Sequence, residues 1–309
     1  MASKKFQNIA LATLIATLLL ILVGGLVRVS GSGLGCPDWP RCWGCWLPPT
    51  DVSKIDSLQY DISQYNPTKM WIEYANRMVG VVIGLLVLST FLCSIRHRKS
   101  HPRLFWASMA AFALVVFQGW LGGEVVKSGL RPGIITLHMA LAMALLTLLL
   151  WIAHAAGKPP AQVAGSERLR NLVSLLFVLT CLQVLLGTQV RESIDPHIKK
   201  EGTAEAIPRS EWLSHAGQAD HVHRLFSWAV GAAALVLLAK ARKLPKGSNP
   251  RLLAHIVLAL VATQVLIGVT LAYLDLPPAS QVAHLANSAL LVCSIALLRL
   301  RCQPPPTVD

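Results

Sequence analysis

Three histidines lie inside long apolar stretches of the sequence, where an ionisable side chain is costly and usually functional. They are His138, His223 and His284, and each follows the start of its stretch by about five residues. At about 1.5 Å per helical residue, all three are expected roughly 7–8 Å below one membrane boundary. Imidazoles on two facing helices can hold the iron of a haem from both sides. The alternative is that each histidine hydrogen-bonds a neighbouring helix, but the matched positions of His223 and His284 favour a shared haem.

A second histidine competes with His223, and one expected ligand is missing. His221 lies two residues before His223, about 200° away around a helix, so only one of them can face the interior. We choose His223 because the two halves of the chain resemble each other, as described below, and this internal repeat aligns His223, not His221, with Asn76. Asparagine is a poor iron ligand, so the N-terminal part offers His138 alone and leaves the opposite iron face open. An open face suits oxygen chemistry, whereas two histidine ligands suit electron transfer.

Charged residues surround the same depth. Glu73 precedes Asn76 by about one helical turn. Two interpretations remain open: Glu73 delivers protons or positions a substrate, or it is an interfacial carboxylate paired with Arg77 or Lys127. Four arginines are expected near this boundary, where they would bind haem propionates or extend toward lipid headgroups. They are Arg28, Arg77, Arg191 and Arg224.

The elements that must position these residues are membrane-spanning helices. Of 309 residues, 54% are hydrophobic and only 14% are charged, whereas a soluble domain has about 25% charged residues. This composition excludes an ordinary soluble enzyme and a disordered chain. It predicts an all-α integral membrane protein with eight transmembrane helices. The expected spans are residues 7–27, 71–94, 104–125, 133–155, 171–190, 218–239, 252–274 and 279–299.

The net charge of +13 follows the expected topology. Lys and Arg concentrate at the two ends of the chain and in the short connections on the same side, whereas most Asp and Glu lie on the other side. The positive-inside rule then places both termini in the cytoplasm and the histidines toward the outer face of the cell (inner) membrane. Because topology accounts for the basic excess, nucleic acid is not an expected partner. Long outer loops are expected at residues 28–70 and 191–217.

The two halves of the chain repeat polar residues at matched spacing. Gln118 precedes His138 by 20 residues, and Gln264 precedes His284 by 20 residues. Chance similarity among apolar helices is the alternative, but the shared spacing argues against it. Four helices separate equivalent positions, so both halves run in the same direction, and we expect two pseudo-symmetric four-helix bundles. The predicted halves are residues 1–157 and 158–309.

Three of the seven cysteines, Cys36, Cys42 and Cys45, cluster in the first expected outer loop. An exported loop permits disulfides, and three cysteines leave one unpaired. We expect Cys36 to pair with Cys42, in a structural or a redox role. The spacing is not a zinc signature, and this loop supplies no fourth ligand.

Together these motifs resemble the haem A synthase family over nearly the whole chain. The matching segments are Gly24–Leu34, Cys36-Pro-Asp-Trp39, Glu73-x-x-Asn76-Arg77, Gln118-x-x-Leu121-Gly122, Lys127–Leu130, His138, His223-Arg224, Gln264-x-x-Ile267-Gly268 and His284. The resemblance implies a membrane oxidoreductase that oxidises the C8 methyl group of haem O to a formyl group, which gives haem A for terminal oxidases.

The resemblance also assigns the two halves. The C-terminal half, through His223 and His284, is implied to hold a haem b cofactor, and the N-terminal half, through Glu73 and His138, to hold the substrate haem O. In some family members the matching cysteine pair assists redox chemistry. Self-association and contact with haem O synthase are implied as well, and the reaction needs an electron donor in the membrane.

Asn76 departs from the family pattern, whose members commonly carry Glu-x-x-His-Arg at this place. The change marks either a variant that works through His138 alone or a homologue without the hydroxylation step. Two alternative functions follow. One is a di-haem, cytochrome b-like electron-transfer protein, and the other is a non-catalytic haem-binding or transport protein of the membrane.

Overall fold

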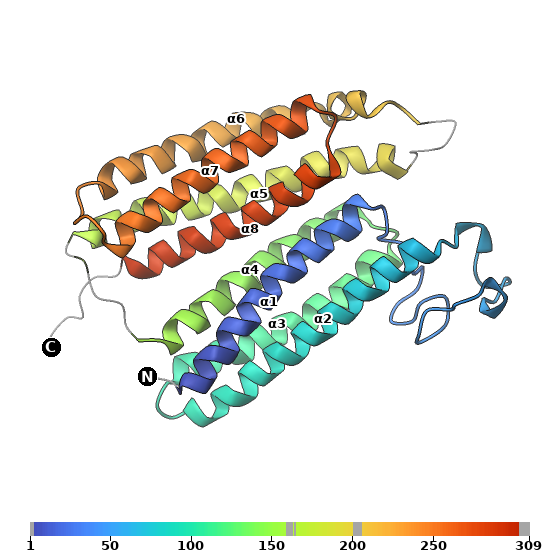
Figure 1. Ribbon diagram of the computed structural model, residues 1–309, viewed down its shortest axis with the longest axis horizontal. Coiled ribbons are helices and arrows are strands. Elements are labelled where there is room, and N and C mark those ends of the chain that lie inside the picture. The colour runs from blue at the N-terminus through green and yellow to red at the C-terminus, as the bar shows by residue number, and fades with distance from the viewer. Residues whose placement is uncertain (1–2, 159–162, 164, 200–205, 303–309) are drawn as a thin grey trace. The chain divides into compact units, whose positions relative to one another are not determined.

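The computed structural model describes residues 3–158, 163, 165–199 and 206–302. Eight α-helices and no β-strand occur in this part of the chain, and each helix is long and apolar enough to cross a membrane. They are α1 (Lys4–Val29), α2 (Pro67–Ser94), α3 (Pro102–Lys127), α4 (Pro132–Ala156), α5 (Arg170–Lys199), α6 (Arg209–Ala241), α7 (Asn249–Tyr273) and α8 (Pro278–Arg301) (Figure 1). The prediction of an all-α protein with eight transmembrane helices is confirmed.

Residue types that favour the start of a helix stand at the beginning of several of these helices. Ser3 and Asn66 precede α1 and α2, and their side chains accept the backbone N–H groups of Phe6 and Lys69, as N-cap residues do. Proline occupies the first turn of α2, α3, α7 and α8, where its missing N–H removes no helical hydrogen bond. The apolar runs that follow then extend each helix to the length of a bilayer crossing.

Large apolar side chains point outward from the helices. Leu19, Leu225, Trp228 and Leu266 are each more than half exposed. A soluble protein rarely leaves so many large apolar groups together in water. An exterior of this kind suits contact with lipid, so the chain is a multi-pass membrane protein.

The described residues of Ala2–Ala156 form one compact unit. Within it α1 packs against α2 and α4, and α3 packs against the same two helices, which closes a four-helix bundle. Phe6, Ile83, Leu146 and Leu149 are fully buried in its core. This N-terminal bundle carries Glu73 and Asn76 on α2 and His138 on α4.

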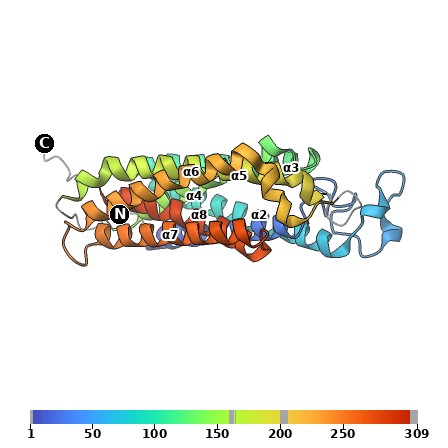
Figure 2. The ribbon, with the colours of Figure 1, turned by 90° about the horizontal axis from the view of Figure 1, so that it is seen from above.

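The described residues of Gly157–Asp309 form the second compact unit. Here α5 packs against α6 and α8, and α7 packs against the same two helices. Leu176, Leu237, Ile295 and Leu298 are fully buried in one core cluster. Figure 2 shows from above that α6 and α7 of this unit run along each other.

The prediction of a second long loop at residues 191–217 is wrong in its extent, because much of this segment is helical. Helix α5 continues to Lys199, and α6 begins at Arg209. Gly217 interrupts α6, since its φ of 50° is incompatible with a regular helix. His223 therefore lies about two turns past this break.

Tertiary contacts explain why the helices extend beyond their apolar spans. Ile194, Trp212 and Leu276 are each buried and form one cluster. His197 on α5 and His215 on α6 stack with ring centroids 4.4 Å apart. Burial of this kind stabilises helical turns that the hydropathy of the local sequence does not reveal.

Candidate functional site

His223 on α6 and His284 on α8 face each other inside the C-terminal bundle. Their ring centroids lie 6.5 Å apart, and the ring planes are inclined by 59°. Two imidazoles that bind one metal through nitrogens at about 2 Å have ring centres roughly 6–6.5 Å apart. The spacing of this pair therefore fits two ligands of a single metal.

The structure also distinguishes the two rival histidines on α6. His221 is exposed, whereas His223 is partly buried. Both ring nitrogens of His223 approach Nε2 of Gln183, at 3.2 and 3.4 Å. Because two residues turn through about 200° of a helix, His221 points away from the bundle. This placement makes His223, and not His221, the partner of His284 in the facing pair.

A haem fits the donors that the structure presents. Nδ1 of His138 and Nδ1 of His284 are buried without a hydrogen-bond partner, as is the side-chain oxygen of Asn76. Within the described residues, no group of three or more His, Cys, Asp or Glu side chains is arranged to hold a bare metal ion. A porphyrin supplies four iron ligands itself and needs only one or two imidazoles from the protein.

The N-terminal bundle presents a single histidine at the corresponding depth. His138 lies in the second turn of α4, as His284 lies in the second turn of α8. The position on α2 that the repeat aligns with His223 is Asn76. The two bundles therefore offer different numbers of imidazoles, one against two.

Glu73 is tied to the loop between α1 and α2 and is only 3% exposed. One carboxylate oxygen accepts the backbone N–H of Cys36 at 2.8 Å, and the other pairs with Arg77. Lys127, the alternative partner suggested by the sequence, instead pairs with Glu124 at 3.2 Å. Glu73 therefore connects α2 to the loop that covers it.

The loop between α1 and α2 is closed by a disulfide between Cys36 and Cys42, the pair expected from the sequence. Cys45 is free and partly exposed. Trp43 is 3% exposed and packs in one cluster with the disulfide and Met70 of α2. The loop is thus a small folded cap with its own apolar core.

Arg77 fastens this cap to α2. Its guanidinium donates to the backbone carbonyl of Arg41 at 2.8 Å and to that of Cys36 at 3.2 Å. Glu73 accepts the backbone N–H of Cys36, while Arg77 donates to backbone carbonyls of the same loop. The two side chains therefore bind both the donor and the acceptor groups of the loop backbone. Glu73 and Arg77 act as one unit.

Peptide mapping of the unreduced protein checks the loop. We expect a Cys36–Cys42 cross-linked peptide, with Cys45 alkylated before reduction, because Cys45 alone of the three is a free thiol. A cross-link that contains Cys45 would show a different loop fold.

Two other arginines predicted from the sequence also have carboxylate partners, and Arg28 lies in the last turn of α1. Arg191 pairs with Asp195 at 3.0 Å and Arg224 with Asp220 at 2.7 Å. A guanidinium has five N–H donors. Each arginine can therefore bind a further carboxylate while it keeps its present partner.

Sequence reasoning missed the role of three glutamines. In each case the side-chain amide donates to the backbone carbonyl of a histidine on the next helix: Gln118 to His138 at 3.0 Å, Gln183 to His223 at 2.9 Å and Gln264 to His284 at 3.1 Å. The available signal was a glutamine four residues before a glycine in α3, α5 and α7. The sequence comparison of the two halves used only the glutamines of α3 and α7, Gln118 and Gln264.

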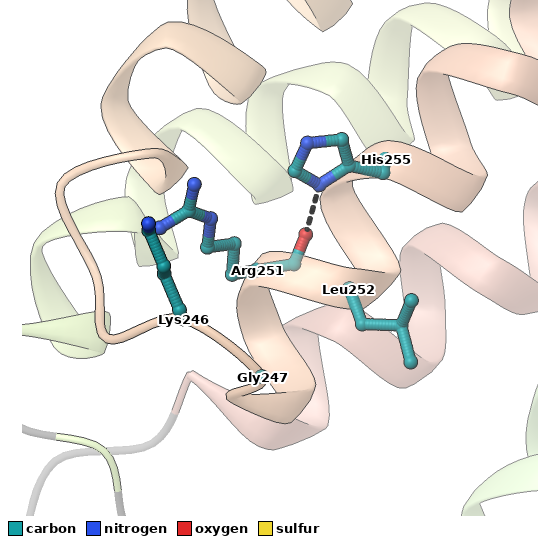
Figure 3. Close-up of a pocket in the computed structure, with 5 residues that line it drawn as sticks. All are labelled: Lys246, Gly247, Arg251, Leu252 and His255. Atoms are coloured by element: carbon teal, nitrogen blue, oxygen red, sulfur yellow. Dashed lines mark hydrogen bonds between the residues drawn. The ribbon is translucent and has the colours of Figure 1, made fainter.

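A pocket of about 280 Å³ lies at the start of α7. Its lining residues, shown in Figure 3, are Lys246, Gly247, Arg251, Leu252 and His255. His255 Nδ1 donates to the Arg251 carbonyl of its own helix at 2.8 Å. Gly268, beside His284, lies about 20 Å further along α7, so this pocket is separate from the paired histidines.

Fold and site together define a class: a helical membrane protein with two facing imidazoles in one four-helix bundle and, at the equivalent position of the other bundle, the single imidazole of His138. Residues 7–296 match the family model COX15-CtaA, cytochrome oxidase assembly protein. The heme A synthase of Shewanella oneidensis is 28% identical, over 93% of this chain and 93% of its own length. That of Methylobacterium sp. (strain 4-46) is 30% identical over 91% and 87%, and that of Nitrosospira multiformis is 25% identical over 88% and 86%. The chain therefore belongs to the haem A synthase family.

Proposed function

We propose that this protein converts haem O to haem A by oxidising the C8 methyl group to a formyl group, with haem b as its cofactor. The observation that carries the proposal is the pair of imidazoles 6.5 Å apart in one bundle, beside a single histidine in the other. Relatives named heme A synthase, similar along most of the chain, support this reaction over other haem chemistry.

In this proposal His223 and His284 hold haem b in the C-terminal half, residues 158–309. His138 holds haem O from one side in the N-terminal half, residues 1–157. When bound, haem would supply the redox chemistry: a pair of imidazoles such as His223 and His284 suits electron transfer, and a single imidazole such as His138 suits oxygen chemistry. The chain's own task is to hold the two haems at fixed places.

Charged residues at the predicted outer ends orient the two haems. Arg28 and Arg77 are assigned to the propionates of haem O, and Arg191 and Arg224 to those of haem b, because guanidinium groups bind carboxylates through paired hydrogen bonds. Glu73 positions the substrate by holding Arg77 and the cap in place. These assignments give the haems one orientation rather than two.

Two successive hydroxylations of the methyl group would give a geminal diol, and its loss of water leaves the formyl group. We place both termini in the cytoplasm and the haem sites near the outer face of the cell membrane, since basic residues gather at the opposite ends of the helices. Haem O synthase as the source of substrate, an electron donor in the membrane and a homo-oligomer are the proposed partners.

Co-expression with a haem O synthase, in cells that make no haem A of their own, tests the function. We expect haem A in the extracted haems, identified by chromatography and mass spectrometry, and haem O alone in cells with the empty vector. Purified protein that carries haem b while haem O accumulates unconverted would favour the electron-transfer alternative.

Replacing Glu73 tests its positioning role. Glu73→Gln puts an N–H group where an acceptor for Cys36 or Arg77 is needed, so the cap shifts. We expect the ratio of haem A to haem O to fall about 10–100-fold, since small misplacements of a substrate have effects of this size. Bound haem b should not change.

Glu124→Gln is the matched control, because Glu124 also forms an ion pair with a nearby basic residue at the same end of the bundle. It should leave the haem ratio unaltered. A normal ratio in Glu73→Gln would remove the positioning role, and loss of haem b as well would make Glu73 a residue of general stability.

A further inference from the structure

A glycine follows each of the three glutamines by one helical turn and lies beside the same histidine ring. A Cβ atom at these positions would approach Cε1 of the ring: Gly122 at 3.6 Å from His138, Gly187 at 3.1 Å from His223 and Gly268 at 3.6 Å from His284. The glutamine holds the histidine backbone, and the glycine leaves room for its ring. We call this arrangement, Gln-x3-Gly on one helix and His on the next, a Gln-Gly cradle.

The fourth helix pair, α1 and α2, lacks the complete cradle. Gly24–Arg28 and Gly187–Arg191 both read Gly-x-x-Val-Arg, which aligns α1 with α5. Four residues before the glycine, α1 carries Leu20 where α5 carries Gln183. No atom lies within 4 Å of the place that a Cβ of Gly24 would take. The glycine of the cradle is present, but the glutamine is not.

Leu20 and Asn76 depart from the repeat together. Leucine cannot donate a hydrogen bond to a backbone carbonyl, and Asn76 replaces the histidine whose carbonyl would be held. The two helices pack against each other, as α5 and α6 do. Where no imidazole has to be held in place, neither the glutamine nor the histidine of the cradle is needed. The absence of both from α1 and α2 fits this expectation.

The cradle around His284 has additional support. Ser288 donates to the same carbonyl at 2.8 Å, and Gln264 also donates to the Ser288 hydroxyl at 2.7 Å. Asn287 donates to the side-chain oxygen of Gln264 at 2.6 Å and to the carbonyl of Leu260 at 2.9 Å. Both ends of the Gln264 amide are therefore fixed.

The corresponding cradle around His138 is simpler. The positions 146 residues before Asn287 and Ser288, the offset between His284 and His138, are Leu141 and Ala142. Neither side chain can hydrogen-bond, and the side-chain oxygen of Gln118 is buried without a partner. Among the side chains that the structure describes, Gln118 is thus the one shown to donate to the His138 carbonyl.

We propose that the three cradle glutamines are positioning residues for the histidines that bind haem. The incomplete pair Leu20 and Asn76 leaves the N-terminal bundle with one cradled histidine, so its haem is held from one side and exchanges readily. The C-terminal bundle has two cradles, one of them reinforced, and retains its haem. This inference rests on the proposed function, in which the first haem is a substrate and the second a cofactor.

Paired variants in the purified, haem-loaded full-length protein test the cradles. Gly187→Ala crowds the His223 ring at 3.1 Å, whereas Gly24→Ala, the equivalent change in α1, meets open space. Gln183→Leu removes the donor to His223, whereas Thr180→Val alters a buried residue one turn earlier on the same helix. The readouts are the electron paramagnetic resonance signal of low-spin ferric haem and the rate of haem transfer to apomyoglobin.

We expect Gly187→Ala and Gln183→Leu to shift the low-spin signal and to speed transfer of the C-terminal haem about 10–100-fold, the usual effect of removing a residue that orients a metal ligand. Gly24→Ala and Thr180→Val should change neither readout. Equal effects of the variants and their controls would overturn the positioning role. Gly187→Ala keeps the test valid if Gln183→Leu does not fold.

Building the missing cradle tests the second part. Asn76→His should add a ligand to the N-terminal haem and slow its transfer to apomyoglobin, and Leu20→Gln with Asn76→His should slow it about tenfold further. A double variant no different from Asn76→His would show that Leu20 is not a lost cradle position.

The two failures are distinguishable. A wild-type protein that binds two haems but makes no haem A would contradict the proposed function and leave the cradle effects standing. Haem A production with no cradle effect would contradict the inference alone.

Discussion

A His284→Ala variant is expected to lose the haem of the C-terminal bundle while the protein still folds. The substitution removes one of two facing imidazoles, and the remaining ligand, His223, then holds the iron from one side only. Loss of a direct ligand should exceed the 10–100-fold effect of losing a residue that merely orients one, so affinity should fall by about 100-fold or more. Haem b bound per protein, measured after purification in mild detergent, reports this loss.

Two histidines provide controls for this variant. His255→Ala changes an exposed residue at the other end of α7, and His221→Ala changes the exposed rival on α6. Both should keep normal haem b. Full haem b in His284→Ala would contradict the assignment of this bundle, and loss of haem b in His221→Ala would move the ligand to the other face of α6.

The second large effect is expected for His138→Ala. This variant should keep haem b yet produce no detectable haem A, because the N-terminal bundle has no other histidine at this depth. Misplacement of a bound substrate by about 1 Å can already slow a reaction about 100-fold, and removal of its ligand should do more. The measurement is the ratio of haem A to haem O in extracts of cells that supply haem O.

His154→Ala is the matched control, since His154 lies in the last turn of the same helix, at the predicted inner end. It should leave the haem ratio normal. Undiminished haem A in His138→Ala would place the substrate elsewhere. Loss of haem b together with haem A would show that the two bundles do not hold their haems independently.

Hydropathy predicted the helices well because a bilayer crossing requires an unbroken apolar run, which a single sequence shows directly. The turns of α5 and α6 beyond their spans were missed for a physical reason. Ile194, Trp212 and Leu276 stabilise them by burying one another, and contacts between residues far apart in sequence leave no local periodicity.

At the site, the spacing of residues predicted how far along its helix each histidine lies, but not the direction in which its ring points. The distance of His223 and His284 from their helix starts placed both at one level, whereas only packing shows that their rings face each other. Glu73 had two candidate partners in the sequence, and the fold of the Cys36–Cys42 cap selects Arg77. Gln183 was overlooked because the spacing of a glutamine four residues before a glycine does not by itself show that the amide donates to the His223 carbonyl on the next helix.

The most direct test asks whether His223 and His284 share one iron. Electron paramagnetic resonance of the purified ferric protein should show one low-spin signal typical of two imidazole ligands. That signal should disappear in His223→Ala and in His284→Ala and persist in His138→Ala. A signal that survives loss of either C-terminal histidine, or that vanishes with His138, would contradict the account.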